Sequence, residues 1–473
     1  MNAFHDRELE LATLESLYAQ DGGTLLILYG RRRVGKTTLI QRFLEGKRGL
    51  YLLATEESGT ENLGYFRSLV ADFLGDDLVR EAVGLSWEKL AARFTTATGK
   101  KVLVIDEFQY LCTSNPAFSS LMQRMYDTVL KPAGVMVVLC GSYIRMMESE
   151  TLNYDSPLYG RRDGQIRLTQ IPFRYFGDFL PGRSEDERIQ YFAVTGGVPR
   201  YIEMMTQSSD LQTAIDERIL DPQSMLFEEP FFLLSHEVRD IGSYFTLLKT
   251  LAAGHRRPSE IAATMQIKQT SLSKLLSALM QLDLVERTVP VTEENPEKSK
   301  KGLYSIKDHF LSFWFRFVFP YRSSLSMRDF THARENLRQN FVSGQVSRVF
   351  EDICAEKLWA LSEKGAFGGP LQKVAPWWDS RTEIDCVGLG IDRTTLVSAE
   401  CRYSVHRIGP AVLADLKRKT ERIPWNNDQR TEIFVLFSRS GFDASLEGIA
   451  AADPHVLLIG LDAERTQPER KPV

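Results

Sequence analysis

The segment from position 30 to position 37 has the residue types and spacing of a loop that holds nucleotide phosphates. It reads Gly-Arg-Arg-Arg-Val-Gly-Lys-Thr and fits the pattern G-x-x-x-x-G-K-[ST] in full. We expect Lys36 to reach the β- and γ-phosphates of ATP and the Thr37 hydroxyl to ligate Mg²⁺. The other residues expected to contact the nucleotide are Gly30, Arg31, Arg32, Arg33, Val34, Gly35 and Thr38. The alternative is a chance glycine turn before a helix.

Two carboxylates follow an apolar stretch further along the chain. Residues 102–105 are Val-Leu-Val-Ile, and Asp106 and Glu107 come directly after them. We expect Asp106 to join the magnesium shell and Glu107 to orient or deprotonate the attacking water. Ser142 ends the next apolar run, where a small polar side chain can touch the γ-phosphate or the water. A turn that merely leaves the sheet is an equal alternative for Ser142.

A parallel sheet would bring these residues to one edge. Short apolar runs separated by helical segments predict parallel strands covered on both faces. The expected strands span residues 24–29, 50–54, 102–105, 135–140 and, more weakly, 166–171, and helical periodicity follows from 175 to 234. The fold class predicted for this part is therefore α/β.

The remaining chain predicts two further modules. Helical segments at 245–251, 259–264 and 270–280 precede strands at 284–289 and 303–306, a pattern typical of a winged helix. A helix over 342–361 and strands at 383–387, 395–400 and 433–437 indicate a third α/β region. The expected domains are a core at 1–172, a helical segment at 173–240, a winged helix at 241–320 and a last domain at 337–463.

The predicted winged helix carries side chains suited to DNA. A recognition helix presents its first residues to the major groove, and lysines on the wing can meet phosphates. The candidate contacts are Lys268, Gln269, Ser271, Lys274, Lys298, Lys300 and Lys301. Because Glu293, Glu294 and Glu297 share the wing, a protein partner remains the alternative to double-stranded DNA.

The last region has acids that resemble the D-x(n)-E-x-K core of the restriction-endonuclease-like superfamily. That resemblance implies that Asp385 and Glu400 share a divalent metal, with Glu351 as an extra ligand. Arg402 stands where the pattern has lysine, and arginine cannot act as a base. An active nuclease, a fold kept for binding, and ordinary acids at strand ends therefore all remain open.

The chain as a whole resembles the prokaryotic ATPases of the AAA+ and STAND-related group that carry a C-terminal nuclease-like domain. The matching segments are residues 4–10, 30–37, 106–111, 141–142, 156–161 and 196–201. The resemblance implies strand order 5-1-4-3-2, a helical lid and then a winged helix. It places Arg7 and Pro199 near the base and sugar, and it makes Arg161 a candidate arginine finger or phosphate sensor. Asp6 stands where such families usually have glycine, and a solvated basic turn is the alternative for Arg161.

Composition narrows the function classes. The 473 residues are 43% hydrophobic and 25% charged with a net charge of -4, so a globular protein of about three domains without a global basic field is expected. The odd number of cysteines, 5, and the absence of C-x-x-C spacing argue against a disulfide framework and a zinc site. No signal peptide or membrane span is expected, which favours the cytoplasm.

These observations predict an ATP-hydrolysing switch or motor that uses ATP and Mg²⁺ and engages DNA. Two alternatives stay open. One is a nucleotide-dependent signalling scaffold that binds protein partners or further copies of the chain. The other is an ATP-gated DNA nuclease.

Overall fold

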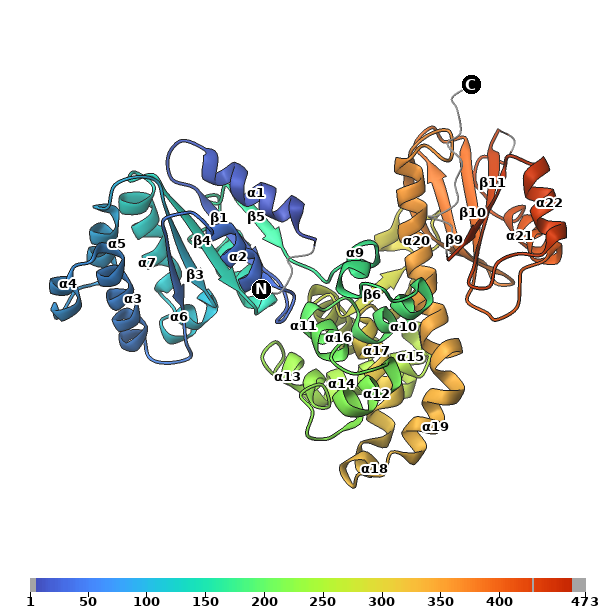
Figure 1. The fold of residues 1–473 in the computed structure, drawn as a ribbon, viewed down its shortest axis with the longest axis horizontal. Coiled ribbons are helices and arrows are strands. Elements are labelled where there is room, and N and C mark those ends of the chain that lie inside the picture. Colours follow the sequence, from blue (N-terminus) through green and yellow to red (C-terminus); the bar gives the residue numbers. More distant parts are fainter. Residues whose placement is uncertain (1–5, 428, 462–473) are drawn as a thin grey trace. The chain divides into compact units, whose positions relative to one another are not determined.

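The computed structural model describes residues 6–427 and 429–461, which divide between two compact units (Figure 1). The first unit comprises Met1–Ile171, Val198–Arg200 and Phe232–Arg239, and the second comprises Pro172–Gly197, Tyr201–Phe231 and Asp240–Val473. Phe4 and His5 of the amino-terminal segment lie outside the described residues, as do positions 428, 462 and 463 of the predicted last domain.

A five-stranded parallel sheet forms the centre of the first unit. Its order is β2-β3-β4-β1-β5, which confirms the order 5-1-4-3-2 read from the other edge. The strands are β1 (Leu25–Tyr29), β2 (Gly49–Leu53), β3 (Lys101–Asp106), β4 (Val135–Gly141) and β5 (Gly164–Arg167). Every residue of β1, β3 and β4 is buried, as continuous apolar strands in a doubly covered sheet require.

Helices cover this sheet, and α1 and α2 share one hydrophobic cluster with it. Leu14 of α1 and Leu39 and Phe43 of α2 belong to that cluster. The helices are α1 (Glu8–Ala19), α2 (Lys36–Leu44), α3 (Gly59–Leu74), α4 (Asp77–Glu81), α5 (Trp87–Thr95), α6 (Phe108–Ser114), α7 (Phe118–Met125) and α8 (Ile144–Met147). Two π-helical turns, Tyr126–Leu130 and Glu148–Leu152, extend α7 and α8.

The second unit begins with helices and one hairpin. Its first helices are α9 (Phe173–Phe176), α10 (Glu185–Thr195), α11 (Pro199–Met205), α12 (Leu211–Ile215) and α13 (Glu229–Ser235), of which α11 and α13 cross between the units. The three helices and hairpin predicted from residue 245 onward are present. They are α14 (Ile241–Ala252), α15 (Pro258–Met265), α16 (Gln269–Gln281), β6 (Val285–Thr288) and β7 (Leu303–Ile306), with β6 and β7 antiparallel.

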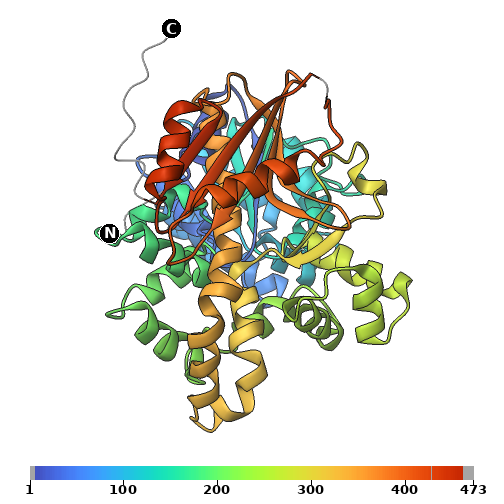
Figure 2. The same ribbon diagram turned by 90° about the vertical axis from the view of Figure 1, so that its right-hand side faces the viewer.

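A second five-stranded sheet ends the chain, and α20 packs against three of its strands (Figure 2). Its order is β12-β11-β10-β9-β8. The strands are β8 (Leu371–Trp378), β9 (Glu383–Gly390), β10 (Thr395–Arg402), β11 (Thr431–Ser438) and β12 (Val456–Gly460). The helices of this part are α17 (His309–Phe317), α18 (Arg322–Ser326), α19 (Thr331–Asn340), α20 (Ser347–Glu363), α21 (Pro410–Thr420) and α22 (Ala444–Ala452).

Three details differ from the sequence expectations. The fifth strand of the first sheet ends at Arg167 rather than continuing to residue 171. The helix expected from residue 342 starts as a π-helical turn, Phe341–Val346, before α20. The strands β8 and β12 were not predicted at all, and both lie at edges of the second sheet.

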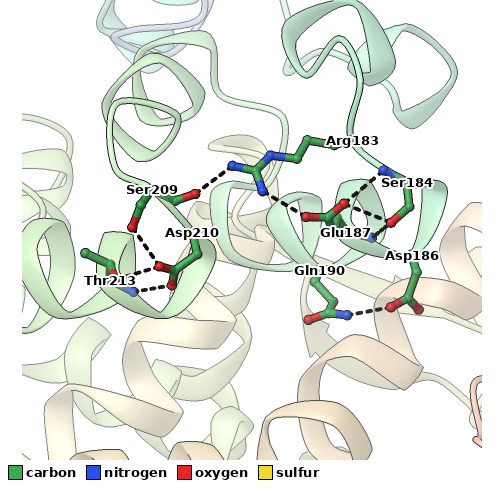
Figure 3. A network of polar contacts seen from close by, with 8 residues as sticks. All are labelled: Arg183, Ser184, Asp186, Glu187, Gln190, Ser209, Asp210 and Thr213. Atoms are coloured by element: carbon green, nitrogen blue, oxygen red, sulfur yellow. Dashed lines mark hydrogen bonds and ion pairs between the residues drawn. The ribbon is translucent and has the colours of Figure 1, made fainter.

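A polar network fixes the start of α10 in the second unit (Figure 3). Ser184 and Glu187 form a capping box, and Arg183 joins Glu187 at 2.9 Å to the carbonyl of Ser209 at 2.8 Å. Asp210, next along the chain, caps α12. The network therefore ties two helices together at their N-termini.

The five cysteines are free and buried. Within the described part of the chain, no helix is both long enough and apolar enough to cross a lipid bilayer.

Candidate nucleotide site

The phosphate loop between β1 and α2 depends on glycine at two positions. A Cβ on Gly30 would lie 2.2 Å from the carbonyl oxygen of Leu168, and Gly35 has a φ of 95°. Lys36 is buried, and its Nζ donates to the carbonyl oxygens of Gly30 and Arg31 at 2.8 Å each. Burial lowers the pKa of Lys36. The loop thus holds an ammonium where the sequence predicts phosphate contacts.

Asp106 stands at the carboxyl end of β3, beside the first turn of α2. Its Oδ2 accepts hydrogen bonds from Thr37 Oγ1 at 3.1 Å and from Tyr51 Oη at 2.5 Å. Burial is the main cause of the raised pKa of Tyr51, and its hydrogen bond to Asp106 adds to it. A threonine hydroxyl beside a carboxylate is a donor pair that suits Mg²⁺, which takes oxygen ligands and keeps several waters. The residues present therefore fit the predicted metal.

Glu107 links the ends of β3 and β4. Its backbone has a φ of 54°, a left-handed conformation that costs a non-glycine residue free energy and often marks a functional site. Its Oε2 accepts from Ser142 Oγ at 2.7 Å, Ser142 N at 3.2 Å and Gln109 Nε2 at 2.5 Å. The structure thus brings the predicted base and Ser142 together, and it adds Gln109, whose role the sequence did not single out.

Arg32 of the phosphate loop lies between two tyrosines. Its Nη2 donates to Tyr110 Oη at 2.8 Å and to Tyr143 Oη at 2.9 Å. The Tyr143 hydroxyl also lies 2.8 Å from His236 Nδ1, and the two rings stack with centres 5.2 Å apart. Burial, then the charge of Arg32, lowers the pKa of His236. Sequence analysis missed both tyrosines and the histidine, although each tyrosine follows closely on a strand end that carries a predicted site residue.

The amino-terminal segment also contacts the loop. Arg7 donates to the carbonyl of Val34 at 3.3 Å and to that of Thr169 at 2.5 Å. Asp6, in the place of the expected glycine, has a φ of 59°, so the backbone there keeps a conformation that glycine adopts freely. Pro199 lies beside Gly35, since a Cβ built there would be 3.9 Å from its Cγ.

The other loop residues differ in exposure. Arg31 and Val34 are buried, Arg33 is partly buried with a φ of 71°, and Thr38 is exposed on α2.

Arg161 lies away from these residues. It lies three residues before Gly164, the first residue of β5, which pairs with Leu26 near the start of β1. Its guanidinium binds Asp127 at 2.9 Å and the carbonyl of Pro157 at 3.0 Å. Because all strands are parallel, this position is at the amino edge of the sheet, opposite the phosphate loop. The structure therefore places Arg161 away from the phosphate loop of its own chain, and its role as an arginine finger or phosphate sensor stays a prediction.

The predicted DNA contacts are exposed in the second unit. Lys268 is the residue before α16 and makes no side-chain capping bond, and Gln269, Ser271 and Lys274 lie on the solvent side of that helix. The lysines of the loop between β6 and β7 are exposed as well, namely Lys298, Lys300 and Lys301. Lys301 forms an ion pair with Glu293 at 2.8 Å.

The two acids of the nuclease-like pattern come from adjacent antiparallel strands, but cations of the chain already surround one of them. Glu400 pairs with Arg402 at 2.5 Å and with Lys419 at 3.3 Å, whereas Asp385 accepts the backbone N–H of Cys401 at 2.8 Å. Lys419 lies on α21.

Glu351 and Asp385 line a cavity of about 280 Å³. Burial, then the neighbouring Asp385, raises the pKa of Glu351 to about 8, and burial, then Glu400, raises that of Asp385 to about 6. Among the described residues, no three His, Cys, Asp or Glu side chains are grouped so as to hold a metal ion. The metal roles of Asp385 and Glu400 stay predictions.

The fold and the phosphate loop define the class of this protein as a nucleotide-binding P-loop ATPase. A domain family described as an ATPase domain predominantly from Archaea matches residues 4–205, and a family described as archaeal and bacterial proteins of unknown function matches residues 314–414. The Walker-type ATPase of Pyrococcus abyssi has a similar fold, with a TM-score of 0.50 and 20% identity over 66% of this chain and 96% of that one.

Two relatives from Methanocaldococcus jannaschii are closer in sequence. An uncharacterized protein is 30% identical over 422 residues, covering 89% of this chain and 92% of that protein. An uncharacterized ATP-binding protein is 53% identical over 45 residues, covering 10% of this chain and 76% of that protein. The chain belongs to the family of the first relative, and the archaeal type of ATPase domain lies in the amino-terminal part of this chain.

Proposed function

We propose that the chain hydrolyses ATP at the carboxyl edge of its first sheet and acts as a nucleotide-controlled switch or motor. The observation that carries the proposal is the convergence of Lys36, Asp106 and Glu107 on that edge. The phosphate loop encloses the lysine, and Asp106 is hydrogen-bonded to Thr37. Glu107 is held by donors from the end of β4.

The chemistry assigned to these residues is hydrolysis of the terminal phosphoanhydride. Water forms a bond to the γ-phosphorus, the bond from that phosphorus to the bridging oxygen of ADP breaks, and the water proton passes to Glu107. Lys36 offsets the negative charge on the leaving side. Thr37 and Asp106 would hold Mg²⁺, which supplies charge neutralisation between the β- and γ-phosphates.

The test compares wild-type protein with Lys36→Ala. We expect Lys36→Ala to abolish ATP hydrolysis, and Arg42→Ala, an exposed arginine on the same helix, to leave it unchanged. If Lys36→Ala hydrolyses ATP at the wild-type rate, the proposed site is wrong.

We extend the proposal to DNA, through a winged helix made of α14–α16 and the β6–β7 hairpin. Its support is the exposed start of α16, where Lys268 and Lys274 are free to meet phosphates. We propose binding rather than cleavage, because Arg402 and Lys419 already pair with Glu400.

A titration of double-stranded DNA at several salt concentrations tests this part. We expect the affinity to fall steeply as salt rises, and the slope to decrease by about one for Lys268→Ala. Lack of binding at low salt would favour the scaffold that binds protein, which the Lys301–Glu293 pair in the wing also supports.

A further inference from the structure

Among the described residues, no carboxylate forms an ion pair with the positive charge of Arg32. In the part of the chain that the structure describes, its hydrogen-bond partners are the two phenols of Tyr110 and Tyr143. No acid lies within ion-pair distance of it among those residues, whereas Arg161, for example, pairs with Asp127. The guanidinium also lies 5.1 Å from the centre of the Tyr143 ring. Neutral partners leave its charge available to an anion.

The two tyrosines place this charge on the side of the site where hydrolysis is proposed. Tyr110 lies on α6, which begins directly after Glu107, and Tyr143 follows Ser142 at the end of β4. Glu107 and Ser142 are hydrogen-bonded to each other at 2.7 Å. Arg32 is therefore held by one tyrosine that follows Glu107 and by one that follows Ser142. Glu107 and Ser142 are the pair that would meet the attacking water and the γ-phosphate.

A second cation stands close by. Lys36 belongs to the same loop, and its Nζ donates at 2.8 Å to the carbonyl oxygen of Arg31, the residue next to Arg32. Two cations in one loop, Arg32 and Lys36, favour a ligand with several negative charges. The terminal phosphate of ATP has such a charge, and this charge spreads over its outer oxygens as the bond breaks.

His236 orients the phenol that holds Arg32. Burial is the main cause of the raised pKa of Tyr143, so its hydroxyl stays protonated. A neutral His236 can accept that proton at Nδ1, 2.8 Å away. The lone pairs of the phenol oxygen are then directed to the N–H of Arg32.

We propose that Arg32 is the arginine that contacts the terminal phosphate of ATP in its own chain, and that Tyr110 and Tyr143 are positioning residues for it. This inference rests on the proposed ATP hydrolysis. It transfers to Arg32 the role that the sequence suggested for Arg161. It also implies that one chain contains a complete set of charges, so turnover per chain does not depend on protein concentration.

The experiment measures kcat, KM and the binding of a fluorescent ADP analogue for the full-length chain. We expect Arg32→Ala to lower kcat by about 100-fold or more, since an arginine in this role is worth about 10³–10⁵ in kcat. ADP binding should change by less than about threefold, because a charge that acts on the γ-phosphate is not used by the diphosphate. Retained ADP binding also shows that the variant is folded.

The double variant Tyr110→Phe, Tyr143→Phe keeps both rings and removes both hydroxyls. We expect it to lower kcat with little change in KM, whereas a purely structural role of the rings would leave kcat unchanged. The matched control is Arg42→Ala, which removes a charge from α2 outside the site.

Three outcomes would overturn the inference. They are a kcat of Arg32→Ala within about threefold of wild type while Lys36→Ala is inactive, a wild-type kcat for the double variant, and specific activity that rises with protein concentration. The first of these leaves the proposed function intact. Hydrolysis by Lys36→Ala at the wild-type rate would instead remove the proposed function, and the inference with it.

Discussion

At the scale of single residues, the site contains side chains whose protonation states follow from their surroundings. His236 is exposed to solvent on one side, lies near Arg32 and is hydrogen-bonded to Tyr143. Burial and the nearby positive charge both disfavour its charged form, and the nearby Glu56 opposes them only in part. The imidazole should be neutral at neutral pH and should accept the Tyr143 proton.

Protonation of His236 should destabilise the first unit in mildly acidic solution. Because the pKa is lowered from its ordinary value of 6.5 in the folded state, the unfolded chain binds more protons between the two pKa values. The stability that comes from this group is thus complete above about pH 6.5 and is lost as the pH falls through the lower, folded value. The melting temperatures of wild type and His236→Gln from pH 5 to pH 8 measure this contribution of His236 to stability.

The glutamine variant has a side chain that does not titrate, so the pH dependence of its melting temperature should be flatter than that of wild type over this window. Parallel melting curves for the two proteins would contradict the assignment of a neutral histidine.

At the scale of elements, the turn between β1 and α2 requires glycine at position 30, because a larger residue has no room there. Gly30→Ala would place a Cβ 2.2 Å from the carbonyl oxygen of Leu168, which is backbone and cannot move aside easily. We expect a cost on the order of 1–3 kcal/mol in unfolding free energy and loss of nucleotide binding. Chemical denaturation and ADP titration measure the two effects.

Gly64 in α3 gives the matched glycine. A Cβ there meets nothing within 4 Å, and alanine is favoured over glycine inside a helix by about 0.8–1.0 kcal/mol. We expect Gly64→Ala to be stabilising and to bind nucleotide normally. Equal effects of the two substitutions would show that space at Gly30 is not what limits the loop.

Helix α10 is joined to the second sheet through Asp186. This carboxylate accepts from Tyr403 at 2.6 Å, just after β10, and pairs with Arg439 at 2.6 Å, just after β11. We expect Asp186→Asn to cost about 1–3 kcal/mol, since a charged hydrogen-bond acceptor is lost at a partly buried contact. Faster hydrogen exchange in α10 and β10 would show it, while the exposed Glu421→Gln should leave exchange unchanged.

The strands that were predicted from the sequence have an apolar pattern, and the two that were missed, β8 and β12, lie at the edges of the second sheet. The three central apolar runs of the first sheet were found because burial on both faces gives a continuous apolar strand. The phosphate loop was found from its Gly-Lys-Thr motif. Strand β8 was missed because it contains Pro376 and register shifts, which only an edge strand tolerates. Strand β12 is a short edge strand whose residues after Val456 are only partly buried.

The candidate site was predicted in the same uneven way. Asp106, Glu107 and Ser142 were expected at one edge because carboxyl ends of parallel strands meet there. The contacts of Arg32 with Tyr110, Tyr143 and His236 were not, because no local pattern relates residues so far apart in the chain. The position of Arg161 depends on the start of β5, which carried a weak signal.

At the scale of the whole molecule, the first unit is completed by residues from distant parts of the chain. Val198–Arg200 and Phe232–Arg239 belong to it, although the chain on either side of each segment belongs to the second unit. Through them Pro199 reaches the phosphate loop and His236 reaches Tyr143. Glu237 accepts the backbone N–H of Ile144 at 2.9 Å, so the second of these segments also caps α8.

A chain truncated after residue 172 should therefore be a poorer ATPase than its motifs suggest. It keeps Lys36, Asp106 and Glu107 but loses both added segments, and burial around the loop decreases. We expect a lower melting temperature and weaker ADP binding than in the full-length chain. If the truncated chain binds ADP with unchanged affinity, the two segments are dispensable for the site.

The central claim is that Glu107 directs the water that hydrolyses ATP bound by the phosphate loop. The most direct measurement is ATP binding and single-turnover hydrolysis by Glu107→Gln, which keeps the shape of the side chain but not its basicity. We expect ATP to bind with wild-type affinity and the rate to fall by about 10²–10⁴-fold. A wild-type rate in this variant would contradict the account.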